Sequence, residues 1–388
     1  MCRKDGRMQE PSSALQHLKE LRQENGRRIW RLSSFNQYLD AKARQMGVPL
    51  TGQFELTPLC NFSCKMCYVH LDVGQLNGKA LLSVETWKDL IHQAWEAGMM
   101  HVTLSGGECL TYPGFDDLYL YVQSLGCDVS ILTNGYLLDD RRIEFFRQHK
   151  PAMIQISLYG SDDDAYERVT GVRAFGRVAE NVQKAIEAGF NVRLVLTPST
   201  YMGEDALETL RFARSITPNV IINSTVFAPR EETGRSQQRD NPDADFFVKL
   251  FRLSYELDGR ETKEIDPAKL PPVGGTSHEC DKCGLLCGGA RSGFVVDWKG
   301  NLMPCNSLDM IRADLLKDGF REGWKQIHQA VAEWPLVPEC QGCAYSEICH
   351  RCAGIMIQYA APGKQPTKMC EQIKYLVQRG VAKFQECE

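Results

Sequence analysis

The distribution of cysteines constrains the fold of this chain more than any other feature of its sequence. Sixteen of the 388 residues are cysteines: six lie at or before Cys127, none lies in 128–279, and ten lie in 280–387. Residues 1–7 are charged and precede no apolar run, so no secretion signal is recognisable and a reducing compartment is expected. Under reducing conditions, two dense cysteine clusters indicate metal sites on two modules rather than disulfides.

Charge and hydropathy exclude several classes of protein. The chain has 45 Lys and Arg against 49 Asp and Glu, which gives a net charge of −4 and a pI near 6.1. This balance provides no basic surface for duplex nucleic acid, and no stretch reaches the roughly 18 uncharged apolar residues of a membrane span. We therefore expect a cytoplasmic protein with neither a nucleic-acid nor a membrane partner.

A regular alternation of short apolar runs and longer segments of helical period begins at residue 53, which is typical of βα units with parallel strands. The predicted strands are 53–58, 101–105, 128–132, 153–158, 191–197 and 219–224. The predicted helices are 83–98, 115–125, 139–149, 175–189, 204–216 and 243–257, several of them ended by a glycine (Gly98, Gly126, Gly189). Six such units predict an α/β fold, an open partial (β/α)6 TIM-like barrel whose chemistry lies in loops at the C-terminal ends of the strands.

The same patterns divide the chain into three regions. Leucines at helical spacing predict an N-terminal helical segment over 1–50, and the βα rhythm predicts the barrel over 51–258. After residue 258 the rhythm gives way to Pro, Gly and Cys, which indicates a linker and then a cysteine-rich domain over 259–388.

Three cysteines directly follow the first predicted strand. Cys60, Cys64 and Cys67 form a Cys-x3-Cys-x2-Cys loop at the mouth of the predicted barrel. A 4Fe–4S cluster usually has four cysteine ligands, so three in one loop would leave one iron open to a small molecule. The alternative is a structural zinc site with a fourth ligand such as His70, although this spacing is uncommon for zinc.

This triplet resembles the hallmark of the radical S-adenosylmethionine (radical SAM) enzymes. The turn formed by Gly106, Gly107 and Glu108 after the second strand is similar to the Gly-Gly-Glu motif of that family, which holds the amino end of the methionine moiety. The resemblance also implies that Ser157 and Arg168 bind the methionine carboxylate, for which an arginine fork is suited. Taken alone, Gly-Gly-Glu would be an ordinary turn and Arg168 a solvated helix charge.

Two residues depart from the family pattern. Met66 stands before the third cysteine where an aromatic residue is frequent, and we expect its polarizable sulfur to pack against adenine instead. Cys109 follows the Gly-Gly-Glu turn where proline is common, and we expect it to be a buried thiol rather than a ligand.

The C-terminal cysteines resemble the SPASM extension found behind radical SAM barrels, which binds two auxiliary 4Fe–4S clusters. The resemblance implies an outer cluster on Cys340, Cys343, Cys349 and Cys370. It implies an inner cluster on Cys287, Cys305 and Cys352, with Cys280 or Cys283 as the fourth ligand or with an open iron. One departure is the gap of two residues before Cys352, where three are frequent. By itself, the run from Cys340 to Cys352 would equally suit a four-cysteine zinc site.

Together these resemblances imply an oxidoreductase or maturase with three 4Fe–4S clusters and S-adenosylmethionine, reduced by an external flavodoxin or ferredoxin. We expect it to generate a 5′-deoxyadenosyl radical that abstracts hydrogen from a ribosomally made peptide or protein, which then acquires a crosslink, an oxidised side chain or an inverted stereocentre. The charged loop 230–245 is expected to be solvated, with a peptide path as the alternative.

Three alternative functions remain at this point. One is a tetrapyrrole-modifying radical SAM enzyme, and another is protein oxidation of the sulfatase-maturase kind. Against the latter, Asn306 follows Cys305 where those maturases resemble one another in having an aspartate that can act as a base. Outside the enzyme class, the alternative is a zinc-binding interaction protein.

Overall fold

A computed structural model describes residues 35–230, 240–271, 287–335, 337–341, 343–349 and 352–382. Of the predicted N-terminal helical segment, residues 35–46 are helical and 1–34 lie outside the described residues. Cys280 and Cys283 also lie outside them, so the structure does not address the fourth ligand of the inner cluster.

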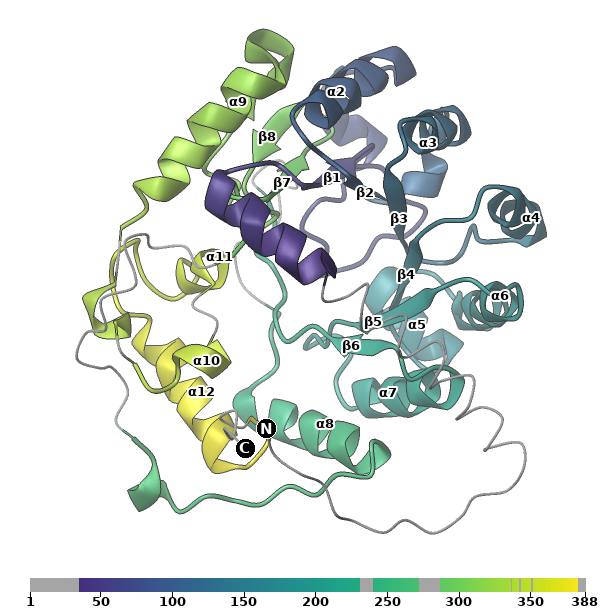
Figure 1. Cartoon of the computed structure of the whole chain (residues 1–388). Helices are drawn as coiled ribbons and strands as arrows, with labels where there is room; N and C mark the ends of the chain where they lie inside the picture. Colours follow the sequence, from purple (N-terminus) through teal and green to yellow (C-terminus); the bar gives the residue numbers. More distant parts are fainter. Residues whose placement is uncertain are drawn as a thin grey trace.

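Six parallel strands form the barrel sheet in the order β6-β5-β4-β3-β2-β1, which confirms the predicted α/β partial barrel (Figure 1). The strands are β1 (Thr51–Glu55), β2 (His101–Ser105), β3 (Asp128–Thr133), β4 (Met153–Leu158), β5 (Val192–Leu196) and β6 (Val220–Ile222). Because all six run in one direction, their C-terminal ends and the loops that follow them gather at one edge of the sheet.

Helices follow these strands, and most of them cover the outer face of the sheet (Figure 1). They are α2 (Val84–Glu96), α3 (Phe115–Ser124), α4 (Asp140–Gln148), α5 (Asp163–Thr170), α6 (Phe175–Glu187), α7 (Asp205–Ile216) and α8 (Ala244–Leu257). Helix α2 illustrates why they form: the Ser83 hydroxyl accepts a hydrogen bond from the backbone N–H of Thr86, and Trp87, Leu90 and Ile91 bury one face. Helix α5 is an addition that the sequence pattern did not predict.

Part of the cysteine-rich region is built onto the barrel. Strand β7 (Gly293–Val296) pairs in parallel with β1, and β8 (Asn301–Met303) and β9 (Ala313–Asp314) continue the same sheet in antiparallel fashion. Gly52 allows this contact, because a Cβ atom there would lie 2.4 Å from a ring carbon of Phe294. Helix α9 (Leu315–Ala332) then packs beside α2, and its Phe320 N–H donates to Gln93 Oε1 at 2.8 Å.

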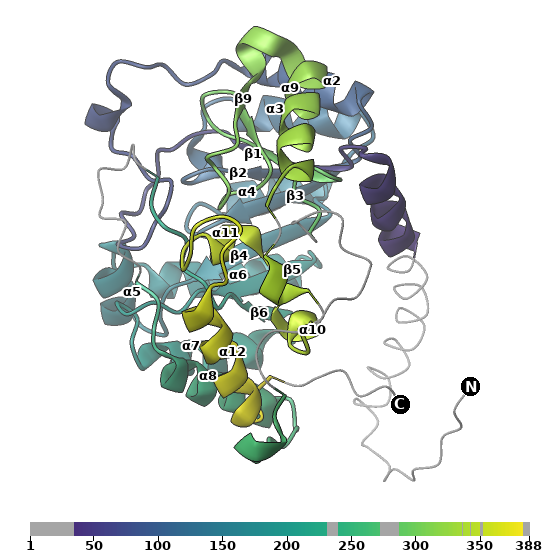
Figure 2. The same ribbon diagram turned by 90° about the vertical axis from the view of Figure 1, so that its left-hand side faces the viewer.

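The remaining C-terminal segment consists of short helices on the side of the sheet that α3, α4, α6 and α7 leave uncovered (Figures 1 and 2). These are α10 (Ser346–Cys349), α11 (Ala353–Met356) and α12 (Thr367–Gln378). Helix α12 lies beside α8, and Tyr255 of α8 donates a hydrogen bond to the carbonyl of Val381 at 3.1 Å.

Four 3-10 helices complete the described secondary structure, and they are η1 (Val73–Leu76), η2 (Cys109–Thr111), η4 (Pro267–Lys269) and η5 (Pro338–Cys340). Within the described ranges, no helix has the length and apolar character that crossing a membrane requires.

Candidate cofactor site and cysteine clusters

The loop with Cys60, Cys64 and Cys67 leaves β1 at the edge where the parallel strands end. Two backbone hydrogen bonds of 2.9 Å hold it against the C-terminus of α5, from Ser63 N–H to the Thr170 carbonyl and from Lys65 N–H to the Val169 carbonyl. The unpredicted helix α5 is therefore a support for the cysteine loop.

Hydrogen-bond donors point at sulfur atoms of this loop. Cys60 Sγ accepts from the backbone N–H of Phe62 at 3.3 Å and from Asn134 Nδ2 at 3.6 Å, and Cys67 Sγ accepts from the backbone N–H of His70 at 3.3 Å. Donors of this kind stabilise sulfur as a thiolate, which is the form that binds metal. The donor set therefore fits an iron–sulfur cluster.

Burial has the opposite effect on these thiols, because it disfavours the thiolate. Desolvation, together with the Glu108 carboxylate, raises the pKa of the Cys60 thiol to about 12. Binding of iron must therefore displace a proton from this thiol. Within the described residues, no three His, Cys, Asp or Glu side chains are grouped closely enough to hold one metal ion. A 4Fe–4S cluster differs from a single ion in that its cysteines bind separate irons.

Tyr159, which follows β4, is a neighbour of the loop that the sequence analysis missed. Burial raises its pKa well above the usual value, and the charges of Cys64, Cys67 and Cys60 raise it further. The Ser157 side chain, near the end of β4, opposes this rise in the pKa of Tyr159.

The Gly-Gly-Glu turn packs directly on the cysteine loop. A Cβ atom on Gly106 would lie 2.5 Å from the Thr57 carbonyl oxygen, and one on Gly107 would lie 2.4 Å from the Leu59 carbonyl oxygen. The backbone N–H groups of Gly107 and Glu108 donate to these same two carbonyls at 2.7 and 3.0 Å. The glycines are therefore needed for close contact between these two loops.

Glu108 is fully buried, and its carboxylate accepts hydrogen bonds from within the protein. The donors are Thr133 Oγ1 at 2.9 Å and the backbone N–H groups of Asn134 and Leu110 at 2.7 and 3.1 Å. Burial raises the pKa of Glu108, and these bonds oppose that rise. Because Asn134 also donates to Cys60, Glu108 links the end of β3 to the cysteine loop.

The two remaining residues predicted to bind the cofactor have protein neighbours. Arg168 on α5 forms an ion pair with Asp205 of α7 and is 51% exposed, which is the arrangement of a solvated helix charge. Met66 is partly buried and packs, with Tyr159, against a small apolar cluster that includes Val169.

A buried ion pair inside the barrel was not predicted. Glu55, the last residue of β1, is 1% exposed, and its carboxylate accepts from Arg230 Nη1 at 2.6 Å and Nη2 at 3.0 Å. Arg230 also lies 5.3 Å from the centre of the Tyr68 ring, next to the cysteine loop. The expectation of a solvated loop is therefore wrong for Arg230, which is 7% exposed because the carboxylate at the end of β1 draws it into the barrel. Residues 231–239 lie outside the described residues.

The C-terminal cysteines fall into two groups. Burial raises the pKa of Cys352, and the charges of Cys305 and Cys287 add to the rise, so these three thiols are electrostatic neighbours. Burial also raises the pKa of Cys370, and there the added charges are those of Cys349 and Cys343.

Cys340 adjoins the second group, since the N–H of Cys343 donates to the Cys340 carbonyl at 3.4 Å. The structure thus brings Cys287, Cys305 and Cys352 near one another, and likewise Cys343, Cys349 and Cys370, while Cys280 and Cys283 lie outside the described residues.

Comparison with known proteins concerns the barrel, which carries the loop with Cys60, Cys64 and Cys67. Residues 54–215 match the family model described as the radical SAM superfamily. This part of the chain is a radical SAM domain. Radical SAM proteins are enzymes that use a 4Fe–4S cluster and S-adenosylmethionine, and the matched range contains the cysteine loop, the Gly-Gly-Glu turn and Tyr159.

Three relatives extend this comparison. The AdoMet-dependent heme synthase of Methanosarcina barkeri is 22% identical over 329 residues, covering 80% of this chain and 92% of that protein. The PqqA peptide cyclase of Streptomyces rochei is 30% identical over 153 residues, but only 39% of this chain and 42% of the cyclase are covered. The crystal structure of Streptococcus suis SuiB bound to precursor peptide SuiA superposes with a TM-score of 0.61 at 18% identity, covering 84% of this chain and 76% of SuiB, which shows a shared fold.

Proposed function

We propose that this radical SAM enzyme modifies a ribosomally made peptide or protein. The observation that carries the proposal is the loop of three cysteines at the C-terminal edge of the barrel, with backbone and amide donors directed at its sulfur atoms. A cluster bound there with S-adenosylmethionine supplies a 5′-deoxyadenosyl radical, which abstracts hydrogen from carbon.

We assign the first cluster to Cys60, Cys64 and Cys67. The cofactor would lie against the backbone of Gly106 and Gly107, beside Met66 and near Ser157 at the end of β4. We give Glu108 a positioning role, because its carboxylate holds Asn134 against Cys60. Support for Arg168 as a carboxylate ligand is weakest, since it is exposed and paired with Asp205.

We assign two auxiliary clusters to the C-terminal groups, which makes three clusters in all. The outer one would be held by Cys340, Cys343, Cys349 and Cys370. The inner one would be held by Cys287, Cys305 and Cys352, with Cys280 or Cys283 as a fourth ligand. The protein would hold both clusters near the open side of the barrel. There they could pass the second electron of an oxidation to an external flavodoxin or ferredoxin.

Peptide modification is supported by the relatives whose names describe peptide substrates. PqqA peptide cyclase and the SuiB complex with its precursor peptide are two of them. Asn306 counts against sulfatase-type oxidation: its Oδ1 lies 3.5 Å from Gln53 Nε2 of β1, and an amide cannot act as a base.

Tetrapyrrole modification is the second candidate function. The observation in its favour is the M. barkeri heme synthase, which this chain matches over 92% of that protein's length. We therefore propose a direct comparison: reconstituted protein is offered a porphyrin and, separately, short peptides co-expressed with it. A shift in porphyrin absorption without any peptide mass change would favour this second candidate.

The first cluster is tested by replacing Cys60, Cys64 and Cys67 together with alanine. We expect the variant to form no 5′-deoxyadenosine from S-adenosylmethionine and dithionite, because it lacks all three ligands. Cys127→Ala is the matched control, since Cys127 is a buried thiol whose Sγ lies 3.8 Å from the Met99 carbonyl, away from the loop. Undiminished 5′-deoxyadenosine formation by the triple variant would contradict the proposal.

A further inference from the structure

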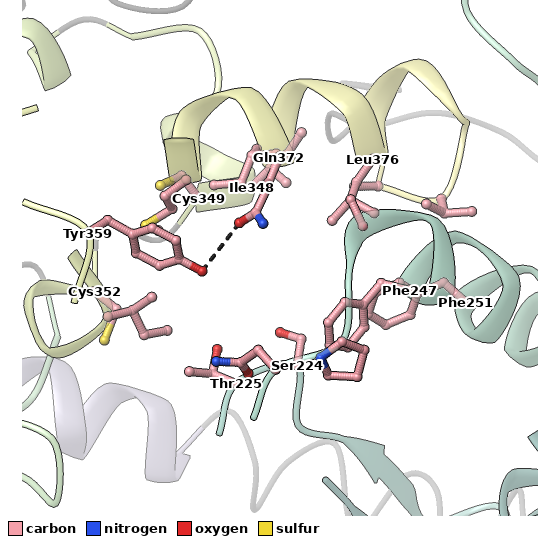
Figure 3. Close-up of a pocket in the computed structure, with 18 residues that line it drawn as sticks. Ser224, Thr225, Phe247, Phe251, Ile348, Cys349, Cys352, Tyr359, Gln372 and Leu376 are labelled. Carbon is pink, nitrogen blue, oxygen red and sulfur yellow. Dashed lines mark hydrogen bonds between the residues drawn. The ribbon is translucent and has the colours of Figure 1, made fainter. Parts of the chain in front are cut away.

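A cavity of about 430 Å³ lies between the barrel and the C-terminal helices (Figure 3). Helices α8 and α12 form two of its walls, α11 and the end of α10 form a third, and the segment after β6 closes the fourth. Its volume is within the range of small-molecule and side-chain sites.

One end of the cavity is apolar. Phe247 and Phe251 of α8 stack there with ring centres 6.0 Å apart and ring planes at 26°, and Leu376 of α12 faces them. Stacked rings present a rigid apolar surface, so this end favours an aliphatic or aromatic group.

The other walls are polar but carry no charge. The Tyr359 hydroxyl donates to Gln372 Oε1 at 3.3 Å, and Ser224 and Thr225 lie across the cavity from that pair (Figure 3). Apart from Cys349 and Cys352, which would be thiolates when they hold clusters, the described residues that line the cavity are uncharged. Hydroxyl and amide groups can bind a peptide backbone, but an anionic group buried here would lack a cationic partner.

Two cysteines lie at the end opposite the phenylalanines (Figure 3). Cys349 belongs to the group with Cys370, and Cys352 belongs to the group with Cys305. An occupant of the cavity would therefore lie beside both C-terminal cysteine groups.

We infer that this cavity binds one uncharged, largely apolar side chain of the polypeptide substrate, with the adjoining backbone amides on the polar wall. The inference rests on the proposed function and deepens it. It favours a peptide over a tetrapyrrole, because the carboxylate groups of a tetrapyrrole would find no cationic partner among the lining residues.

Binding of blocked amino acids to the cluster-loaded protein tests this assignment without any turnover. Under anaerobic conditions, calorimetric titration with the N-acetyl amides of phenylalanine and leucine should show saturable binding. The N-acetyl amides of aspartate and glutamate should bind at least tenfold more weakly, because no cationic side chain lines the cavity. Equal affinity for charged and apolar probes, or tight binding of a tetracarboxylate porphyrin that competes with them, would overturn it.

Substitutions inside and outside the cavity test where the probes bind. Ala244→Phe should fill the cavity from the first turn of α8 and lower the affinity for the phenylalanine probe at least tenfold. Leu257→Phe, on the exposed end of the same helix, should leave its affinity unchanged. If Ala244→Phe does not fold, Phe251→Leu enlarges the cavity and should change the preference between the two apolar probes. Unchanged affinities in the cavity variants would refute the location.

The two proposals can fail separately. Absent probe binding with intact 5′-deoxyadenosine formation refutes the cavity assignment alone. Absent 5′-deoxyadenosine formation refutes the proposed function.

Discussion

Removing one partner of the Glu55–Arg230 pair should destabilise the fold far more than removing one partner of an exposed pair. Arg230→Met leaves the Glu55 carboxylate buried at 1% exposure without the two hydrogen bonds of 2.6 and 3.0 Å that now compensate its charge. Breaking a buried pair in this way costs about 3–5 kcal/mol. Burial by itself lowers the pKa of Arg230, but the Glu55 charge and hydrogen bonds outweigh it and raise that pKa, which agrees with a strongly coupled pair.

The expected effect can be expressed as a change in melting temperature. With an unfolding entropy of about 2.1 cal/mol/K per residue, a chain of 388 residues loses about 4–6 °C in Tm for that free energy. Replacing both partners, as Glu55→Leu with Arg230→Met, removes the buried charge as well, and Tm should return to within about 2 °C of the parent. Scanning calorimetry of the anaerobically prepared variants measures these shifts.

Arg168→Met is the matched control, because Arg168 forms its ion pair with Asp205 at 51% exposure. Exposed pairs contribute about 0–1 kcal/mol, so Tm should fall by about 1 °C at most. If Arg230→Met lowers Tm no more than Arg168→Met does, or if the double variant is as unstable as the single one, the argument from burial is wrong.

Three other substitutions or measurements test separate parts of the structure. Cys370→Ala should lower the iron content by one cluster, about four irons, while 5′-deoxyadenosine still forms; equal iron in variant and parent would contradict the outer cluster. Gly107→Ala places a Cβ atom 2.4 Å from the Leu59 carbonyl oxygen and should reduce the free energy of unfolding, measured by calorimetry, by about 1–3 kcal/mol. Gly176 has open space around it, so Gly176→Ala should cause no such reduction. Burial raises the pKa of Cys127 to about 11. The rate of its alkylation by iodoacetamide, followed by peptide mass spectrometry, should therefore rise roughly tenfold per pH unit between pH 8 and 10. A rate that levels off near pH 8.5 would show an ordinary thiol.

The barrel was predictable from sequence because its signals are local. Short apolar runs mark most of the strands, and the expected helix stops Gly98, Gly126 and Gly189 have φ values of +114°, +77° and +74°. Helix α5 was missed because it has only eight residues and directly follows β4 without a long apolar period. Its end signals were available, since Asp162 caps its first turn and Gly171 ends it with φ +77°.

Long-range contacts within the site were not predictable in the same way. Glu55 lay inside the first predicted strand, 53–58, and nothing local in the sequence pairs it with Arg230, 175 residues later. Likewise, the Gly-Gly-Glu pattern identified the residues of the second loop, whereas its role in holding Asn134 and Cys60 depends on the end of β3. The pairing of β7 with β1 depends on the fit of Phe294 against Gly52, which no periodicity reports.

The grouping of the C-terminal cysteines was only partly predictable from the sequence. Spacing alone allowed one zinc site on the run from Cys340 to Cys352, yet the structure separates Cys349 and Cys352 into different groups although only two residues lie between them. Helix α10 ends at Cys349 and α11 begins directly after Cys352, so the two cysteines lie at the ends of different short helices. Helices of four residues gain little stability from their own hydrogen bonds. Clusters bound to both groups would therefore stabilise these two helices, and we expect the helicity of α10 and α11 to depend on iron loading.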